Sequence, residues 1–352
     1  MNPSPINQDQ AILRGLLKAT REAVIVTDAN LRITAVNAAA AAAFSRGLPF
    51  ETRRLSEAVR DLKLHEAYSR ATETGEVTDL KLETGIIEKR KFDVHVAPLE
   101  LQSGRGAVGF FYEITQVERL ENVRQEFLSN ISHELRTPLT SILAFVETLE
   151  DGAIDDEENN RRFLNVIRRN AERMRVLISE IMELSLIEAG KVHIEIRTFH
   201  PAQLVDEVFT NMSAAAAESL VRLVNEIPKD VTVSADAIRL EQMLTNLVDN
   251  AIKFSREEGT VTAAYSRENG RDLISVADTG EGISPEHVRR IFERFYRVDR
   301  SRSREIGGTG LGLSIVKHLA RLQGGEVYAQ STLGSGSVFT IALPVREPEA
   351  NL

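Results

Sequence analysis

Apolar residues recur at steps of three and four through the middle of the chain, from Ile114 to about Gly190. This period is that of one face of an α-helix. A polar stretch at 151–156 interrupts it and predicts a turn, so we expect two long amphipathic helices joined as a hairpin. The apolar positions are Val117, Leu120, Phe127, Ile131, Leu135, Ile142, Val146 and Leu149 in the first helix and Phe163, Ile167, Met174, Leu177, Ile181 and Leu184 in the second.

The predicted hairpin cannot cover both of its apolar stripes by itself. Two copies packed as a dimeric four-helix bundle would bury them, so we expect a homodimer through this region. Asn170 interrupts the second stripe, and a polar residue at such a position can fix the register of pairing.

The pattern before the hairpin, in residues 12–115, alternates short apolar strands with helices and turns. Asn37 precedes the alanine-rich run 38–43 and is expected to cap a helix there. The region therefore predicts an α+β domain of the size of a sensor, with a small antiparallel sheet and helices on one side. The expected strands are 23–28, 32–36, 76–82, 89–98 and 106–112.

Helices and strands mix again in residues 199–346, which also carry most of the glycines with an evident role. This pattern predicts an α/β sandwich with a nucleotide site. The whole chain is then a multidomain α+β protein: a flexible N-terminus at 1–11, the sensor-like domain at 12–115, a linker and helical hairpin at 116–190, the sandwich at 199–346 and a tail at 347–352.

Composition and charge narrow the possible functions. A net charge of −9 argues against a nucleic-acid partner, and the absence of cysteine excludes disulfides, thiolate metal sites and cysteine nucleophiles. No apolar run reaches about 18 residues, and the first residues lack the basic-then-apolar order of a secretion signal. We therefore expect a cytoplasmic protein with no membrane span, although a piece of a membrane-anchored parent would look similar.

His133 lies on the polar side of the first long helix. At about 100° per residue, the apolar residues Phe127, Ile131 and Leu135 point away from it. Polar residues surround His133, so the helix is expected to present the imidazole to solvent.

Three neighbours of His133 suggest chemistry rather than an ordinary surface histidine. Glu134 can hydrogen-bond one ring nitrogen and leave the other free to attack. Thr137 lies one turn on, where its hydroxyl could position a water or a phosphoryl group. Pro138 lacks an N–H and is expected to loosen the helix directly after His133.

The run His-Glu-Leu-Arg-Thr-Pro at 133–138 resembles the H-box of sensor histidine kinases of the HisKA type. The resemblance implies that His133 accepts the phosphoryl group and that Glu134 is the base that assists the attack. It also implies that Thr137 serves a phosphatase activity toward the phosphorylated partner.

The segment 240–254 predicts an amphipathic helix in the C-terminal region. Asn246, Asn250 and Lys253 share one face, within about 60° of each other, opposite an apolar face. Two amides and an ammonium on one face suit a hydrated Mg²⁺ and the phosphates it bridges, because Mg²⁺ prefers oxygen ligands.

Two further segments follow this helix. Asp278 ends a predicted strand and can accept a hydrogen bond from an exocyclic amine such as that of adenine, while Gly280 and Gly282 let a base approach the backbone. Phe295 belongs to an aromatic and basic tract that precedes a predicted mobile lid at 299–305.

The glycine-rich run 307–313 opens a predicted helix that continues to about Leu322. Glycines permit unusual backbone angles, and the exposed amides at the start of a helix attract phosphate. The run is not a Walker loop, because no Gly-Lys-Ser/Thr follows. The residues concerned are Gly308, Thr309, Gly310, Leu311 and Gly312.

Together these segments resemble the nucleotide boxes of the same kinases, in the same order, over roughly residues 115–345. The resemblance implies an α/β-sandwich ATP-binding domain of the Bergerat type, with ATP and Mg²⁺ as cofactors. Asn250 would be the main Mg²⁺ ligand with Asn246 supporting it, and Asp278 would recognise adenine. The partner would be the aspartate of a response-regulator receiver domain.

The N-terminal domain resembles a PAS sensor in its strand–helix pattern, in Asn37 and in the Glu-Ile-Thr at 113–115. Its ligand is unknown. Without cysteine it is not a cysteine-adduct flavin photoreceptor, and His65 and His95 are expected to be solvated or structural rather than haem ligands.

Three alternatives remain open at this stage. Another ATPase of the same nucleotide fold, such as a chaperone or a mismatch-repair ATPase, would not need His133 and Glu134 on a dimer helix. A serine kinase of the anti-sigma type would also lack the hairpin. A dimeric scaffold that binds ATP without transferring its phosphate is the non-enzymatic alternative.

Overall fold

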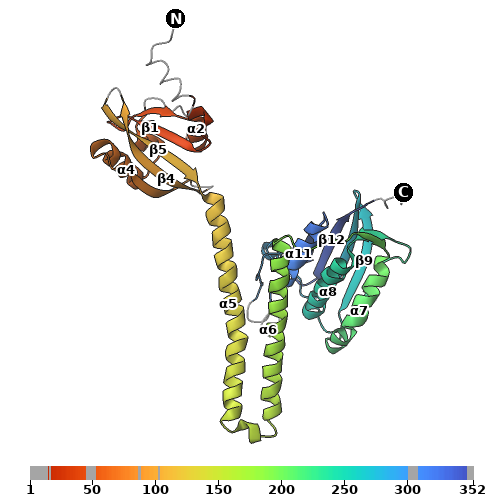
Figure 1. Ribbon diagram of the computed structural model, residues 1–352. Helices are drawn as coiled ribbons and strands as arrows, with labels where there is room; N and C mark the ends of the chain where they lie inside the picture. Colours follow the sequence, from red (N-terminus) through yellow and green to blue (C-terminus); the bar gives the residue numbers. More distant parts are fainter. Residues whose placement is uncertain are drawn as a thin grey trace. The chain divides into compact units, whose positions relative to one another are not determined.

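The computed structural model describes residues 15, 17–44, 53–85, 89–101, 104–299 and 308–346. The predicted N-terminus at 1–11, the tail at 347–352 and most of the predicted lid at 299–305 lie outside these residues. The chain divides into two compact units, Met1–Glu126 and Phe127–Leu352 (Figure 1). Each unit is described by itself.

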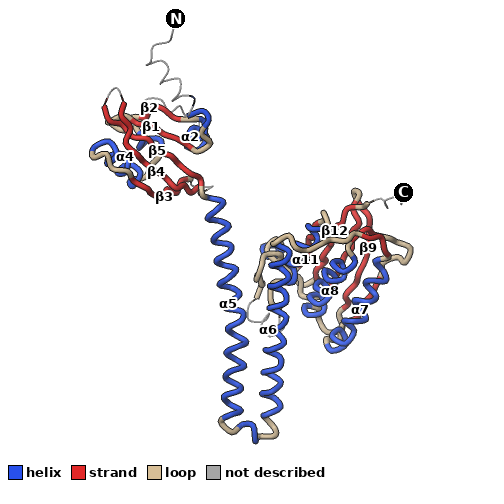
Figure 2. The backbone as a smooth tube through the Cα atoms, in the orientation of Figure 1, coloured by secondary structure: helices blue, strands red, loops and turns tan. Residues whose placement is uncertain are grey.

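The first unit is built on a five-stranded antiparallel sheet with the strand order β2-β1-β5-β4-β3, and helices pack against it (Figures 1 and 2). All five predicted strands are present, and the α+β class is confirmed. The strand β3 lies two residues later than expected, because it pairs with β4 from Thr78 to Thr84. The elements are β1 (Ala23–Thr27), β2 (Ile33–Val36), α2 (Ala38–Phe44), α3 (Leu55–Ala58), α4 (Leu62–Glu73), β3 (Thr78–Thr84), β4 (Arg90–Leu101) and β5 (Gly104–Glu113).

Aromatic side chains fill the core of this unit. The Phe44 ring centroid lies 5.1 Å from those of both Phe92 and Phe111. Tyr68 is fully buried, and its hydroxyl donates to the carbonyl of Ile25 at 3.0 Å, while burial raises the pKa of the phenol. The two histidines are satisfied as the sequence suggests: His65 Nε2 lies 2.9 Å from the carbonyl of Val59, and His95 Nδ1 lies 2.7 Å from Asp79.

Asn37 joins the start of helix α2 to the first strand. Its Oδ1 accepts from the backbone N–H of Ala40 at 2.9 Å, which is the expected helix cap, and also from that of Val24 at 3.0 Å. Its Nδ2 donates to the carbonyl of Glu22 at 2.7 Å. One buried amide therefore satisfies backbone groups of two elements.

Replacing Asn37 with alanine is expected to destabilise the first unit by about 2–4 kcal/mol, because the cap is lost and buried backbone groups lose their partner. Amide hydrogen exchange of β1 and α2 in the whole chain measures this locally. Asn30→Ala in the exposed turn is the matched control, with an expected change below about 0.5 kcal/mol. Equal protection in both variants would contradict the assigned role.

Two long helices form the predicted hairpin (Figure 1). They are α5 (Thr115–Glu150) and α6 (Asn160–Glu188), joined through a short 3₁₀ turn at Ala153–Asp155. Helix α5 continues without interruption through Pro138, so the expected loosening after His133 does not break the helix. Asn170 Nδ2 donates to the carbonyl of Val166 at 2.9 Å and lies 3.4 Å from Ser141 Oγ on α5.

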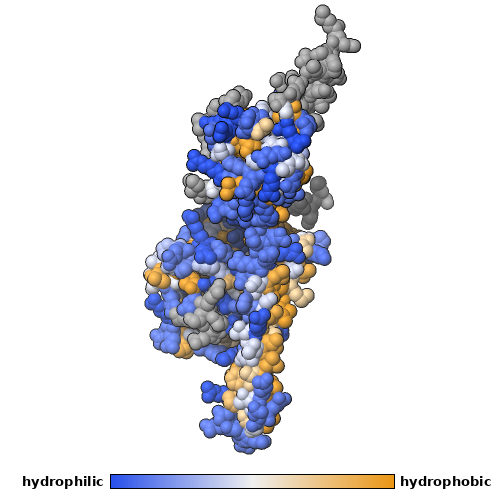
Figure 3. All heavy atoms as spheres, turned by 90° about the vertical axis from the view of Figure 1, so that its left-hand side faces the viewer, coloured by the Kyte–Doolittle hydropathy of each residue, from blue (hydrophilic) through white to orange (hydrophobic). Residues whose placement is uncertain are grey.

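The hairpin leaves a second set of apolar side chains in solvent. The residues predicted to form the stripes are mostly half-buried or buried, and Leu177 and Leu184 belong to the core of the second unit. Figure 3 shows apolar residues gathered along the hairpin. The large exposed ones in Phe127–Glu188 are Leu128, Leu139, Leu143, Ile154, Leu164, Val176, Ile178, Met182 and Leu186.

The rest of the second unit is the predicted α/β sandwich. Its five-stranded sheet has the order β11-β12-β10-β9-β7, in which β7 and β9 are parallel and the other pairs antiparallel. Helices α7, α8 and α11 cover one face (Figure 1), and β6 and β8 form a separate ladder. The elements are β6 (Arg197–Phe199), α7 (Pro201–Glu218), β7 (Arg222–Asn225), β8 (Val233–Ala235), α8 (Ala237–Phe254), β9 (Thr260–Glu268), β10 (Arg271–Asp278), α9 (Pro285–Val288), α11 (Gly312–Leu322), β11 (Glu326–Thr332) and β12 (Gly336–Pro344).

Within the described ranges, none of the helices combines the length and the apolar character needed to span a bilayer.

Candidate functional site

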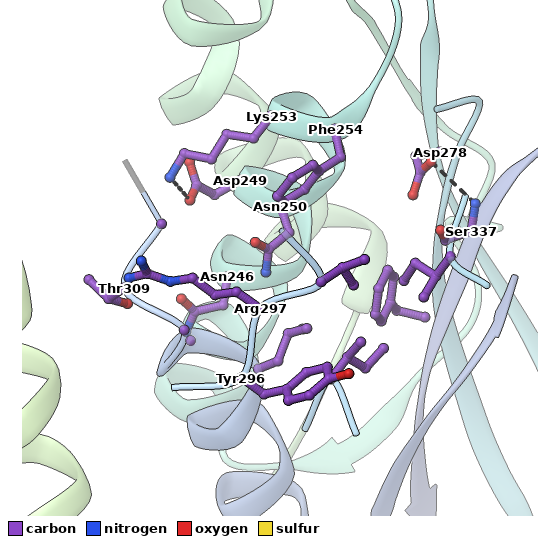
Figure 4. A pocket seen from close by; sticks show the side chains of 18 of the residues that line it. Asn246, Asp249, Asn250, Lys253, Phe254, Asp278, Tyr296, Arg297, Thr309 and Ser337 are labelled. Atoms are coloured by element: carbon purple, nitrogen blue, oxygen red, sulfur yellow. Dashed lines mark hydrogen bonds and ion pairs between the residues drawn. The ribbon is translucent and has the colours of Figure 1, made fainter. Parts of the chain in front are cut away.

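A cavity of about 290 Å³ opens between helix α8, the end of strand β10 and the segments that flank residues 300–307 (Figure 4). It collects most of the residues proposed from the sequence. Those that line it are Asn246, Asn250, Lys253, Asp278, Gly282, Gly308, Thr309, Gly310 and Gly312. Gly280, Phe295 and Leu311 were also predicted at the site but are not among the lining residues.

Helix α8 places three of the polar residues because its other face is apolar. Leu240, Leu244 and Leu247 are fully buried in the core, and Asp236 caps the helix by accepting from the backbone N–H of Arg239 at 3.1 Å. Asn246 and Asn250 point into the cavity (Figure 4). Lys253 Nζ donates to Asp249 at 2.6 Å one turn earlier, so the ammonium is also held at this wall.

Asp278 is the last residue of β10 and is buried. One carboxylate oxygen, Oδ1, accepts from the backbone N–H groups of Gly280 at 2.9 Å and Ser337 at 3.2 Å. Burial raises the pKa of the carboxyl, although these two donors oppose the rise. Asp278 is thus a fixed hydrogen-bonding group at the deep end of the cavity.

Two glycines shape the backbone around the cavity. Gly282 has φ +69°, and a Cβ there would lie 2.1 Å from the carbonyl oxygen of Thr332. Gly310 has φ +78°, and a Cβ there would lie 2.9 Å from the Cα of Phe295. Neither position accommodates a side chain without displacing backbone. Helix α11 begins at Gly312, directly after this segment, so its first amide groups face the cavity end.

Phe295 has a different place from the one expected. Its own φ is +58°, and its ring packs on Phe127 of helix α5 with centroids 5.8 Å apart. The following residues, Tyr296 and Arg297, line the cavity instead. Phe295 therefore joins the sandwich to the hairpin, where Arg294 also pairs with Glu188.

His133 is exposed on α5, as predicted. The Thr137 hydroxyl donates to the His133 carbonyl at 3.2 Å, on the same face. Glu134 is held by two guanidinium groups, with Oε2 at 3.3 Å from Arg173 Nη2 and 3.0 Å from Arg297 Nη2. Among the described residues, these arginines rather than the His133 ring are its partners, because hydrogen bonds from charged guanidinium groups to a carboxylate are strong. Arg297 also lines the cavity, so one residue connects the histidine helix to it.

The cavity also contains a residue that sequence reasoning missed, Glu180 on helix α6. Its Oε2 is buried without a hydrogen-bond partner among the described residues. Burial is the main cause that raises its pKa from 4.5 to about 7. In the sequence Glu180 is one acidic residue among many on a polar helix face, so no local signal marks it.

The raised pKa of Glu180 makes the packing around it dependent on pH. The facing charges are Lys253, which stabilises the carboxylate, and Glu183 and Asp249, which destabilise it. Since the packed state prefers the protonated form, it is most stable below pH 4.5 and loses stability as the pH rises toward 7, by at most about 3 kcal/mol.

Glu180→Gln removes this cost, so the variant is expected to exceed the unmodified protein in free energy of unfolding by more at pH 8 than at pH 5. Urea unfolding of both nucleotide-free proteins at the two pH values measures the difference. A difference independent of pH would contradict the assignment.

The described residues contain no cluster of three or more His, Cys, Asp or Glu side chains able to hold a metal. The oxygen donors that face the cavity from α8 are instead amides, those of Asn246 and Asn250. A cation that keeps most of its waters and takes few protein oxygens, such as Mg²⁺ with a phosphate ligand, fits this donor set.

Comparison with known families divides the chain into three matched regions. Residues 17–119 match the PAS fold, residues 123–190 the His Kinase A (phospho-acceptor) domain, and residues 235–347 the histidine kinase-, DNA gyrase B- and HSP90-like ATPase family.

Two curated relatives are similar over most of this chain. The sensor histidine kinase WalK of Bacillus subtilis is 33% identical over 261 residues, which cover 73% of this chain and 43% of the relative. A sensor protein kinase WalK of Staphylococcus aureus is 35% identical over 272 residues, which cover 76% of this chain and 64% of the relative. The chain thus spans less than two thirds of the length of either.

Two solved structures share the fold. Histidine kinase ThkA in complex with response regulator protein TrrA aligns with a TM-score of 0.52 and 23% identity, over 96% of this chain and 98% of that one. Acinetobacter baumannii histidine kinase AdeS aligns with a TM-score of 0.50 and 24% identity, over 61% of this chain and 98% of that one.

Proposed function

We propose that the chain, with its three matched regions, is a sensor histidine kinase, which transfers the γ-phosphate of ATP to His133 and then to an aspartate of a response-regulator receiver domain. One observation carries the proposal: Glu134, the neighbour of His133, is bound to Arg297, which lines the cavity. The proposed acceptor and the proposed nucleotide site therefore lie in one packed unit.

The cavity suits a nucleotide from one end to the other. At the deep end, the buried carboxyl of Asp278 accepts a hydrogen bond from the exocyclic amine of adenine. At the other end, the backbone around Gly308, Gly310 and Gly312 and the start of α11 bind the phosphates. Between them Asn250, with Asn246 beside it, holds Mg²⁺, which neutralises phosphate charge when bound.

The transfer needs positioning more than covalent help from the protein. A neutral His133 attacks the γ-phosphorus with its unprotonated nitrogen, the bond to the bridging oxygen breaks, and ADP leaves. Glu134 accepts the proton that the other ring nitrogen then loses. Glu134 must first leave Arg173 and Arg297, so the contacts shown belong to a resting arrangement of the two helices and the cavity.

The exposed apolar residues of the hairpin support dimerisation. A hairpin with such a surface gains stability by packing against a second copy as a four-helix bundle. We propose that this homodimer also presents His133, on the exposed face of α5, to the receiver domain.

Incubation with Mg²⁺ and γ-labelled ATP tests the proposal. The unmodified chain is expected to take up label that is acid-labile and stable in alkali, which is the behaviour of a phosphohistidine. His133→Gln and Asn250→Ala should each lower it by at least about a hundredfold, through loss of the acceptor and of nucleotide binding respectively.

His95→Gln is the matched control, since His95 is a histidine on the sheet of the first unit, paired with Asp79. It should label like the unmodified chain. Label that persists in His133→Gln would show that another residue accepts the phosphoryl group. ATP binding without any label would favour the scaffold alternative.

The proposed phosphatase activity makes a separate prediction. Thr137→Ala removes the hydroxyl that could position a water but leaves His133 and the cavity unchanged. The variant should retain autophosphorylation within about threefold and lose at least about tenfold in dephosphorylation of a phosphorylated receiver domain. Thr148→Ala, an exposed threonine of the same helix with the same hydroxyl-to-carbonyl bond, is the control. Unchanged dephosphorylation by Thr137→Ala would contradict the proposed role of Thr137 in the phosphatase activity.

A further inference from the structure

Glu180 belongs to the hairpin but lies among the residues of the cavity. It lines the cavity with Thr309, and its Oε1 lies 3.9 Å from the position that a Cβ on Gly312 would take. Gly312 is the first residue of α11, so the carboxyl lies beside the start of a helix of 11 residues. Its Oε2 is buried as well and has no hydrogen-bond partner in the part of the chain that the structure describes.

Above neutral pH Glu180 is ionised, and its carboxylate then places a negative charge at a position suited to an anion. The start of α11 and the glycine-rich segment offer amide groups to negative charge, and Lys253 in the cavity wall also attracts it. These are the groups that bind phosphate in the proposed function. A second anion so close to Glu180 would be repelled strongly, because the cavity is partly shielded from water.

We propose that Glu180 is an internal competitor of the nucleotide phosphates, so that a bound triphosphate and the packing of α6 against the glycine-rich segment exclude each other. The proposal rests on the proposed ATP site. Nucleotide binding then loosens the packing of α6 against the glycine-rich segment, and the charge on the ligand, rather than its base, is the signal.

A ligand series separates the phosphate from the base. Calorimetric titration of the whole chain in Mg²⁺ would compare a non-hydrolysable ATP analogue, ADP and adenosine. Glu180→Ala is expected to bind the triphosphate about tenfold more tightly, ADP somewhat more tightly and adenosine within twofold of the unmodified chain. Glu172→Ala, an exposed glutamate on the same helix that pairs with Arg175, should leave all three affinities within twofold.

Each other outcome has a distinct meaning. Unchanged or weaker triphosphate binding by Glu180→Ala would overturn the inference and leave the proposed function intact. An equal gain for adenosine would also overturn it, because the side chain would then merely fill space. If neither protein binds any nucleotide, the proposed function fails and the inference falls with it.

A second measurement follows the packing itself. The chain has no cysteine, so Glu188→Cys and Arg294→Cys, at an ion pair between α6 and the sandwich, accept a short bis-maleimide cross-linker without competing sites. The triphosphate analogue, but not adenosine, should lower the cross-linking yield severalfold. Adding Glu180→Ala should abolish that decrease. A yield that the analogue leaves unchanged with Glu180 present would overturn the inference.

Discussion

The burial of one side of helix α8 is the constraint on which the proposed site depends. Seven of its side chains, from Leu240 to Ile252, are buried in the core of the sandwich. Each large one contributes roughly 1.5–3 kcal/mol, whereas a single hydrogen bond contributes about 1 kcal/mol. The apolar face therefore sets the rotation of the helix. Asn246 and Asn250 face the cavity as a consequence, and they need no strong contacts of their own to stay there.

The contact between the hairpin and the sandwich has a different character. It includes the ion pairs Glu134–Arg297 and Glu188–Arg294 and the bond between Glu183 and Gln242, with Phe127 on Phe295 as an aromatic component. Apolar side chains of α6 add to these polar contacts, because Leu177, Leu184 and Ile187 are buried in the same cluster as the core around α8. Separation of the hairpin from the sandwich therefore exposes apolar surface, a cost that a reaction between groups on different domains has to offset.

The sequence predicted what depends on local periodicity. The exposure of His133, the amphipathic nature of α8, the Asn37 cap and all five strands of the first unit follow from spacing along one segment. What it missed depends on contacts between distant segments. Phe295 turns to Phe127 through its own positive φ, and Glu134 finds Arg297, 163 residues away. Neither partner is visible from a motif, because a motif specifies residue types and not the helix that will pack against them.

Glu134 and Glu180 show how these distant contacts bear on function. Both carboxyls come from the hairpin, and both lie against residues of the sandwich that line the cavity: Arg297 beside Glu134 and Gly312 beside Glu180. Each contact joins a carboxyl of the hairpin to a residue of the cavity, so the two parts bind each other when no nucleotide is bound. The two contacts differ in strength. Glu134 accepts from two charged donors, whereas Glu180 keeps one oxygen buried without a hydrogen-bond partner among the described residues. The contact at Glu180 is thus the weaker of the two, and it is the one that the phosphates would reach first.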